Sequence, residues 1–209
     1  MSAPVKAGAR SQHLSPDLEA RLRAPYPTPM HRLFVALRPP APVRTELARI
    51  MGGIRDARWQ DDAQLHLTLR FIGEVERPIA EEIAFALSRV DAPRPEVALS
   101  GVGAFDRQGR TEAIWAGVAP HDGLAALRAK VDSALVRLGL EPERRAYLPH
   151  VTLARLPRRA RAEAEVARFL ADYAGLTSAR FTFDDLILFE SRLGHEGAHY
   201  EPVERWPLG

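Results

Sequence analysis

Two short segments of this chain carry the residues best suited to chemistry, and they share one pattern. His66-Leu67-Thr68-Leu69 recurs in the second half of the chain as His150-Val151-Thr152-Leu153. Because alternate residues of a strand point to the same face, each tetrad in an extended strand places an imidazole beside a hydroxyl and turns its apolar residues to the opposite face. Two such strands facing each other would form a cleft that holds two histidines and two threonines.

These side chains suit hydrolysis or transfer at a phosphodiester. Imidazole titrates near neutral pH, so one ring can accept a proton from water while the other donates a proton to the leaving oxygen. The hydroxyls of Thr68 and Thr152 can donate to phosphate oxygens as negative charge develops there. Positive charge could come from Arg70 or Arg155, which follow the two tetrads. No metal and no cofactor is required by this scheme.

The two arginines differ in their predicted directions. Strict alternation places Arg70 on the same face as His66 and Thr68, whereas Arg155 falls on the face opposite to His150. Arg155 reaches the cleft only if its strand bends or bulges. A single tetrad would favour a locally hydrogen-bonded surface histidine, but two copies in equivalent settings favour a catalytic role.

The elements around the tetrads predict an α+β fold made of two similar halves, each with the order strand, helix, tetrad strand, helix, strand. Apolar runs predict strands at 33–37, 65–72, 97–105, 113–118, 150–156, 181–189 and 200–206. Apolar residues at helical spacing predict helices within 43–54, 79–90, 124–138 and 166–173. We expect two lobes related by an approximate twofold axis, with two antiparallel-rich sheets lining a central groove and helices outside.

Composition sets the remaining bounds. The chain has 209 residues, 46% of them hydrophobic and 27% charged, which is ordinary for a soluble protein. It has no cysteine, no secretory signal and no apolar run long enough to span a bilayer, so we expect a cytoplasmic protein without disulfides or membrane contact. Residues 1–29 are rich in proline and are predicted to be a mobile extension, which leaves 30–209 as a single two-lobed domain.

Several segments together resemble one known family. They are Arg32–Leu37, His66–Gly73, Pro149–Arg155 and Leu188–Ser191. The chain is similar to the two-histidine (2H) phosphoesterases and, more narrowly, to the LigT-type RNA 2′,3′-cyclic phosphodiesterases, historically called 2′-5′ RNA ligases. The resemblance covers about Met30 to Gly209 and excludes residues 1–29.

The resemblance implies that water attacks a 2′,3′-cyclic phosphate at an RNA end and leaves a 2′-phosphate. By position, His66 would be the general acid for the O3′ leaving group and His150 the general base for water. The implied phosphate ligands are Thr68, Thr152 and Arg155, with Arg70 as a further candidate. The sequence alone does not distinguish the acid from the base, because the two tetrads are equivalent.

Alternatives remain at this point. The groove could bind nucleotides or RNA without turnover, or the protein could join RNA ends weakly by the reverse reaction. The expected partners are RNA ends or small nucleotides that carry a 2′,3′-cyclic phosphate, and we expect a monomer. Trp115 or Phe71 could stack on a base, although such aromatic residues more often belong to the core. His195 and His199 have a spacing that can bind a metal on a helix, but the neighbouring glycines favour a loop and surface histidines.

Overall fold

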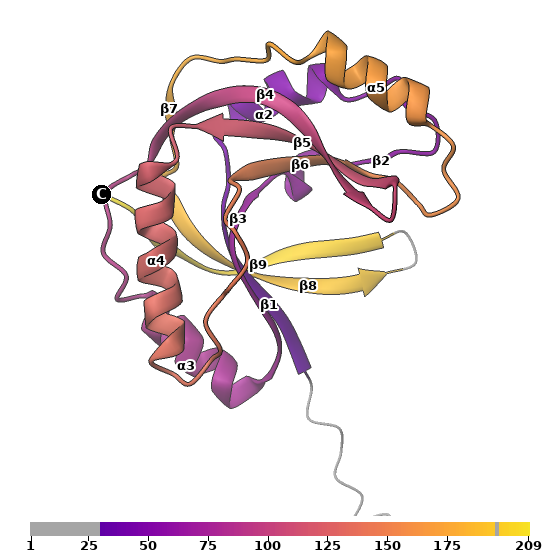
Figure 1. Ribbon diagram of the computed structural model, residues 1–209. Coiled ribbons are helices and arrows are strands. Elements are labelled where there is room, and N and C mark those ends of the chain that lie inside the picture. Colours follow the sequence, from indigo (N-terminus) through magenta and orange to yellow (C-terminus); the bar gives the residue numbers. More distant parts are fainter. Residues whose placement is uncertain (1–29, 195–196) are drawn as a thin grey trace, which may run out of the picture.

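The computed structural model describes residues 30–194 and 197–209 (Figure 1). The predicted N-terminal extension and His195 therefore lie outside the described residues. The strands are β1 (Met30–Leu37), β2 (Arg58–Trp59), β3 (Leu67–Glu76), β4 (Glu96–Arg107), β5 (Arg110–Ala119), β6 (His150–Arg155), β7 (Phe181–Thr182), β8 (Asp185–Gly194) and β9 (Gly197–Pro207). The helices are α2 (Ala41–Ile50), α3 (Arg77–Leu87), α4 (Asp122–Val136), α5 (Glu163–Asp172) and the short 3-10 helix η1 (Asp62–Gln64).

Local sequence explains where several elements begin and end. Every residue of β1 from Leu33 to Leu37 is buried, as expected for a strand covered on both faces. Prolines in the first turns of α2 and α3 fit there because the N–H groups that they lack would have no partner in the helix. Helix α2 ends before Gly52-Gly53, which is earlier than the apolar spacing up to Ile54 predicted.

All strand pairs in the described chain are antiparallel, and they form one sheet with the order β7-β4-β5-β6-β3-β1-β8-β9, with β2 beside β6. We call the β3-β1-β8-β9 part the terminal lobe and the β6-β5-β4-β7 part the central lobe. The predicted α+β class and the two antiparallel lobes are confirmed. The two lobes of this sheet are joined through one pair of residues, Leu67 of β3 and Val151 of β6.

The lobes do not coincide with the halves of the sequence. Strand β4 ends the first half but pairs with β5 of the second, and β8 belongs to the second half but pairs with β1 of the first. The predicted strand 181–189 is accordingly two strands: β7 pairs with β4 in the central lobe, and β8 continues into the terminal lobe. Each half of the chain thus completes the sheet of the other half.

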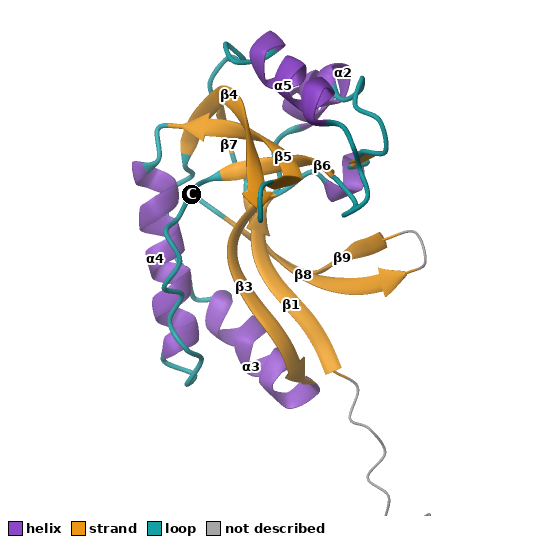
Figure 2. Ribbon diagram, turned by 45° about the vertical axis from the view of Figure 1, so that its right-hand side comes forward, coloured by secondary structure: helices purple, strands orange, loops and turns teal. Residues whose placement is uncertain are grey.

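The helices are also exchanged between the halves of the chain, because each lobe is covered by helices from both halves. Helices α3 and α4 contact each other and cover the terminal lobe at β1 and β3, whereas α5 packs on β4 and β5 (Figure 1). Helix α2 lies beside α5 in both views (Figure 2). The main hydrophobic core fills the space between the sheet and these helices. Among the described helices, none is long and apolar enough to cross a membrane.

Close packing in the central lobe requires a glycine. A Cβ atom at Gly103 of β4 would overlap the six-membered part of the Trp115 indole, which lies across that backbone position. Trp115 in turn lies against His150, with 6.0 Å between the ring centroids. Gly103 therefore allows β4 and β5 to seat an aromatic ring beside the second tetrad.

We expect Gly103→Ala to lower the free energy of unfolding by about 1–3 kcal/mol, because the new methyl group displaces the Trp115 ring. Urea unfolding monitored by tryptophan fluorescence measures this change. Gly52→Ala is the matched control, because a Cβ there meets no atom within 4 Å and should change stability by less than about 1 kcal/mol. Equal stability of the two variants would contradict the prediction.

Candidate active site

The junction of the two lobes fixes the direction in which both tetrads point. Leu67 and Val151 face each other across the β3–β6 pair and are fully buried in the main core. Their neighbours along each strand must therefore point to the opposite face of the sheet. His66, Thr68, His150 and Thr152 are all partly exposed on that face. Because the strands run antiparallel through this pair, the His66 end of the first tetrad meets the Thr152 end of the second.

Each histidine is oriented by the backbone just before it. His66 Nδ1 lies 2.6 Å from the carbonyl oxygen of Gln64, and His150 Nδ1 lies 2.7 Å from that of Leu148. A carbonyl oxygen only accepts hydrogen bonds, so in both rings Nδ1 carries a proton and donates it. Nε2 of each imidazole is thereby left for chemistry in the groove. The two supports are equivalent, because in each case the acceptor is the carbonyl two residues before the histidine.

Gln64 is a supporting residue that the sequence interpretation missed. Its side chain accepts from the Asp61 N–H, while its own N–H donates to the Asp61 carboxylate, and these two bonds form a capping box at η1. Its side-chain amide also donates to the Ala198 carbonyl of β9 at 2.9 Å. The Asp61-Asp62-Ala63-Gln64 spacing could have revealed the box. Asp61 therefore caps the start of η1.

Aromatic rings surround both imidazoles. The ring centroid of His66 lies 5.0 Å from that of Phe34, 5.1 Å from that of Tyr200 and 5.9 Å from that of Phe189. His150 packs edge to face on Phe105 at 4.9 Å, in addition to Trp115. Trp115 is half-buried in these contacts, and a stacking role for it in nucleotide binding stays a prediction.

This burial changes the acid–base properties of both histidines. Desolvation, assisted by the positive charges of Arg155 and His150, lowers the pKa of His66 from 6.5 to about 4, against the opposing effect of the Gln64 carbonyl. Desolvation and then Arg155 also lower the pKa of His150, against the Leu148 carbonyl. His66 is therefore neutral at pH 7 in the free protein. Arg155 is thus within electrostatic range of both rings.

The same bulge occurs after both tetrads and decides which arginine enters the groove. Between the pairs Val35–Arg70 and Ala36–Thr68, Leu69 is an extra residue on β3. Between the pairs Ile114–Ala154 and Trp115–Thr152, Leu153 is the extra residue on β6. Each bulge shifts the alternation by one residue. The groove face after the bulges consequently carries Phe71 on β3 and Arg155 on β6.

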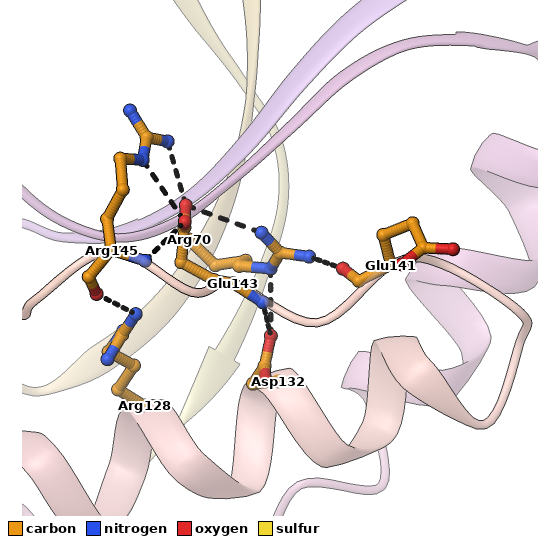
Figure 3. A network of polar contacts seen from close by, with 6 residues as sticks. All are labelled: Arg70, Arg128, Asp132, Glu141, Glu143 and Arg145. Atoms are coloured by element: carbon orange, nitrogen blue, oxygen red, sulfur yellow. Dashed lines mark hydrogen bonds and ion pairs between the residues drawn. The ribbon is translucent and has the colours of Figure 1, made fainter.

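The prediction that Arg70 lies in the groove as a phosphate ligand is wrong, because the bulge at Leu69 turns its side chain to the opposite face. Arg70 is only 8% exposed, and its Nε lies 2.9 Å from the Asp132 carboxylate of α4. Its guanidinium also donates to the Glu141 carbonyl and lies 3.5 Å from Glu143 (Figure 3). Glu143 is bound in turn by Arg145 at 2.7 Å. Arg70 therefore fastens the loop that leads to His150.

A cavity of about 180 Å³ opens at the end of the groove near His66. Its walls come from β2, the end of β6 and β9, and three of its lining residues already belong to the site: Gln64, Arg155 and Tyr200. Phe71 lies beyond the other side of His66, is 51% exposed and packs against Phe34 at 5.9 Å. The groove thus has an arginine and a cavity toward one end and an exposed aromatic ring toward the other.

The two-lobed α+β fold and the paired histidine–threonine strands define the class indicated by the sequence resemblance, the two-histidine phosphoesterases. The model of the 2′-5′ RNA ligase superfamily matches residues 31–195, and the chain belongs to this family.

Named relatives agree with this assignment. The RNA 2′,3′-cyclic phosphodiesterase of Aeropyrum pernix is 34% identical over 144 residues, which cover 68% of this chain and 81% of the relative. The protein of the same name from Archaeoglobus fulgidus is 28% identical over 175 residues, or 82% of this chain and 97% of the relative. The crystal structure of E. coli LigT complexed with 3′-AMP superposes with a TM-score of 0.68 at 25% identity, covering 86% of this chain and 99% of that one.

The position of Arg70 predicts a loss of stability when it is replaced. Arg70→Met should lower the free energy of unfolding by about 3 kcal/mol, because Asp132 then loses its cationic partner at a partly buried site and Glu143 keeps only Arg145. Chemical denaturation measures this value. The control Arg77→Met removes an exposed Arg77–Glu81 pair and should change stability by less than about 1 kcal/mol. Unchanged stability of Arg70→Met would contradict a structural role.

The low pKa of His66 predicts a dependence of stability on pH. The unfolded chain takes up a proton at this residue near pH 6.5, whereas the folded chain does so only near pH 4. In this window the unfolded state binds more protons, so the free energy of unfolding falls as the pH falls from 6.5 to 4. The contribution of His66 is on the order of 3 kcal/mol. Denaturation from pH 4 to 7 should give a shallower profile for His66→Asn than for the wild type, and parallel profiles would contradict the assignment.

Proposed function

We propose that this protein hydrolyses 2′,3′-cyclic phosphates at RNA ends to 2′-phosphomonoesters by paired histidine acid–base catalysis, without a metal ion. The observation that carries the proposal is the burial of Leu67 and Val151 at the lobe junction, which turns both histidine–threonine pairs to one groove. The family assignment and the names of the relatives support a cyclic phosphodiesterase. The complex of E. coli LigT with 3′-AMP supports the groove as a nucleotide site.

The reaction consumes one water molecule and breaks one phosphorus–oxygen bond. Nε2 of His150 accepts a proton from water while the water oxygen bonds to phosphorus. The bond between phosphorus and O3′ breaks, and O3′ takes a proton from Nε2 of His66. The products are a 2′-phosphate and a free 3′-hydroxyl. The hydrogen bonds from Nδ1 to the Gln64 and Leu148 carbonyls hold each ring in the tautomer that this proton transfer needs.

Without substrate, both histidines favour the neutral form, which a general base needs and a general acid does not. Burial keeps His66 neutral in the free protein, and a general acid must be protonated. A bound cyclic phosphate brings a negative charge next to the ring, and a nearby opposite charge raises the pKa of an imidazole. The negative charge of the substrate thus favours the protonated form of His66, which is the form that a general acid needs. The same burial keeps His150 ready to accept a proton.

The threonine hydroxyls and Arg155 stabilise the transition state in this proposal. Thr68 and Thr152 share the groove face with the histidines and donate to the non-bridging oxygens, where charge increases as water attacks. Arg155 lies close enough to both rings to lower their pKa values, so it also lies close to a phosphate held between them. Arg70 is no part of this set, because its guanidinium is bound on the other face of the sheet.

Replacement of either histidine tests the catalytic proposal. His66→Gln and His150→Gln should each lower kcat on an oligoribonucleotide with a 2′,3′-cyclic phosphate by about 10²- to 10⁴-fold, because each removes one proton-transfer step. His199→Gln changes an exposed histidine and serves as the control with unchanged kcat. EDTA should leave the wild-type rate intact, and the product should be the 2′-monophosphate. Near-normal turnover by either variant would reject the proposal, and tight binding of nucleotide without any wild-type turnover would favour a binding module.

The assignment of acid and base is tested by changing the leaving group. A cyclic substrate with sulfur in place of O3′ releases a thiolate, which needs no proton from the enzyme. The variant that lacks the general acid should then recover most of its lost rate, while the variant that lacks the base should not. Recovery by His66→Gln supports the roles given above, and recovery by His150→Gln would reverse them.

A further inference from the structure

A second cleft lies beyond Arg155, outside the groove described so far. It has a volume of about 220 Å³ and is formed by the start of β5, the chain after β6 and the start of α5. Its lining includes Arg110, Arg155, Arg158 and the hydroxyl-bearing Thr111. The turn at Arg110 and the loop at Arg158 come together, because Arg110 Nη1 donates to the Arg158 carbonyl oxygen at 3.1 Å.

The charge balance of this cleft favours an anion. Among the described residues, no carboxylate forms an ion pair with Arg110, Arg155 or Arg158. Glu112 and Glu163 also line the cleft. Glu112 lies 4.0 Å from Arg107, and Glu163 lies in the first turn of α5, where the helix dipole stabilises a carboxylate. Three guanidinium groups without carboxylate partners therefore remain for a ligand.

This cleft adjoins the cavity at the end of the catalytic groove. Arg155, Leu156 and Pro157 line both the 220 Å³ cleft and the 180 Å³ cavity that opens beside Gln64 and Tyr200. Arg155 also lies near enough to His66 and His150 to lower both pKa values. A chain of phosphates that ends between the two histidines can thus pass Arg155 and enter the cleft.

We propose that the cleft formed by Arg110 and Arg158 is a subsite for internal phosphates of single-stranded RNA, so that the preferred substrate is an RNA chain rather than a cyclic mononucleotide. The inference rests on the proposed function for the position of the terminal phosphate. Arginine binds phosphate oxygens through two parallel N–H bonds, and several arginines in a row suit a polyanion of repeating phosphates. A mononucleotide would fill the catalytic groove and leave the cleft empty.

Substrate length separates the subsite from the catalytic groove. For Arg110→Gln and Arg158→Gln, we expect KM for a short oligoribonucleotide with a 2′,3′-cyclic phosphate to rise about tenfold, with kcat nearly unchanged. The kcat/KM value for the corresponding cyclic mononucleotide should stay within about twofold of the wild type, which also shows that the variants fold. Arg137→Gln at the exposed end of α4 is the control and should match the wild type on both substrates.

A binding measurement tests the subsite without requiring turnover. Fluorescence anisotropy with single-stranded RNA ending in a 2′-phosphate should show weaker binding by the double variant Arg110→Gln/Arg158→Gln, but not by Arg137→Gln. Loss of two phosphate contacts should also make the slope of log K against log[salt] shallower by about 1.4. This result would support the subsite even if the wild type failed to hydrolyse cyclic phosphates, so failure of the subsite and failure of the proposed function are distinguishable.

Two results would overturn the inference. One is an unchanged KM and an unchanged affinity for the oligoribonucleotide in the double variant. The other is an equal loss on the oligoribonucleotide and on the cyclic mononucleotide, which would place the arginines in the support of the catalytic groove rather than in a separate subsite.

Discussion

The structure depends on one contact, the antiparallel pairing of Leu67 with Val151 at the junction of the two lobes. Both side chains are completely buried. Exposing them to solvent would lose the free energy of apolar burial on both strands at once. This cost fixes the register locally, because a slip by one residue would move every side chain of a strand to the opposite face. The polar residues of the tetrads thus owe their position in the groove to the apolar residues between them. The geometry of the candidate active site thus follows from the packing of the hydrophobic core.

The aromatic surroundings of the histidines have two opposite effects on chemistry. Phe34 and Tyr200 on one side and Phe105 on the other hold the rings in place and exclude water from them. The exclusion of water also removes the solvation that an imidazolium needs, so the free site favours neutral rings. Arg155 strengthens this preference. A phosphate reverses it, since its charge neutralises the arginine and favours protonation of the adjacent ring. In the proposed reaction the site would therefore acquire its active charge state with its substrate, and a neutral ligand would not induce it.

The sequence predicted the parts of this arrangement that depend on local patterns, and the parts that depend on pairing were out of reach. The alternation of His66 and Thr68 with buried leucines predicted the strand and its faces correctly. The same alternation gave the wrong face for the residues after Leu69. The bulge there depends on the register with the neighbouring strand β1, and the residues Leu69-Arg70-Phe71 do not indicate a bulge by themselves. The exchange of β4 and β8 between lobes was missed for the same reason: repeated segments show that two units exist, but not which strands pair.

The bulges also give a direction to a site that would otherwise be symmetric. Two tetrads with the same histidine and threonine, related by a twofold axis, would bind a phosphate equally well in either orientation. The residues that the bulges bring to the groove differ: Phe71 lies on one side with Arg145 over its ring at 6.0 Å, and Arg155 lies on the other. The residues turned away differ as well, because Arg70 ties down the loop before His150 whereas Ala154 makes no polar contact of this kind. In the proposed reaction, a substrate with a charged chain on one side of its reactive phosphate would be oriented with that chain toward Arg155. This orientation would assign different tasks to two histidines that the sequence presents as equivalent.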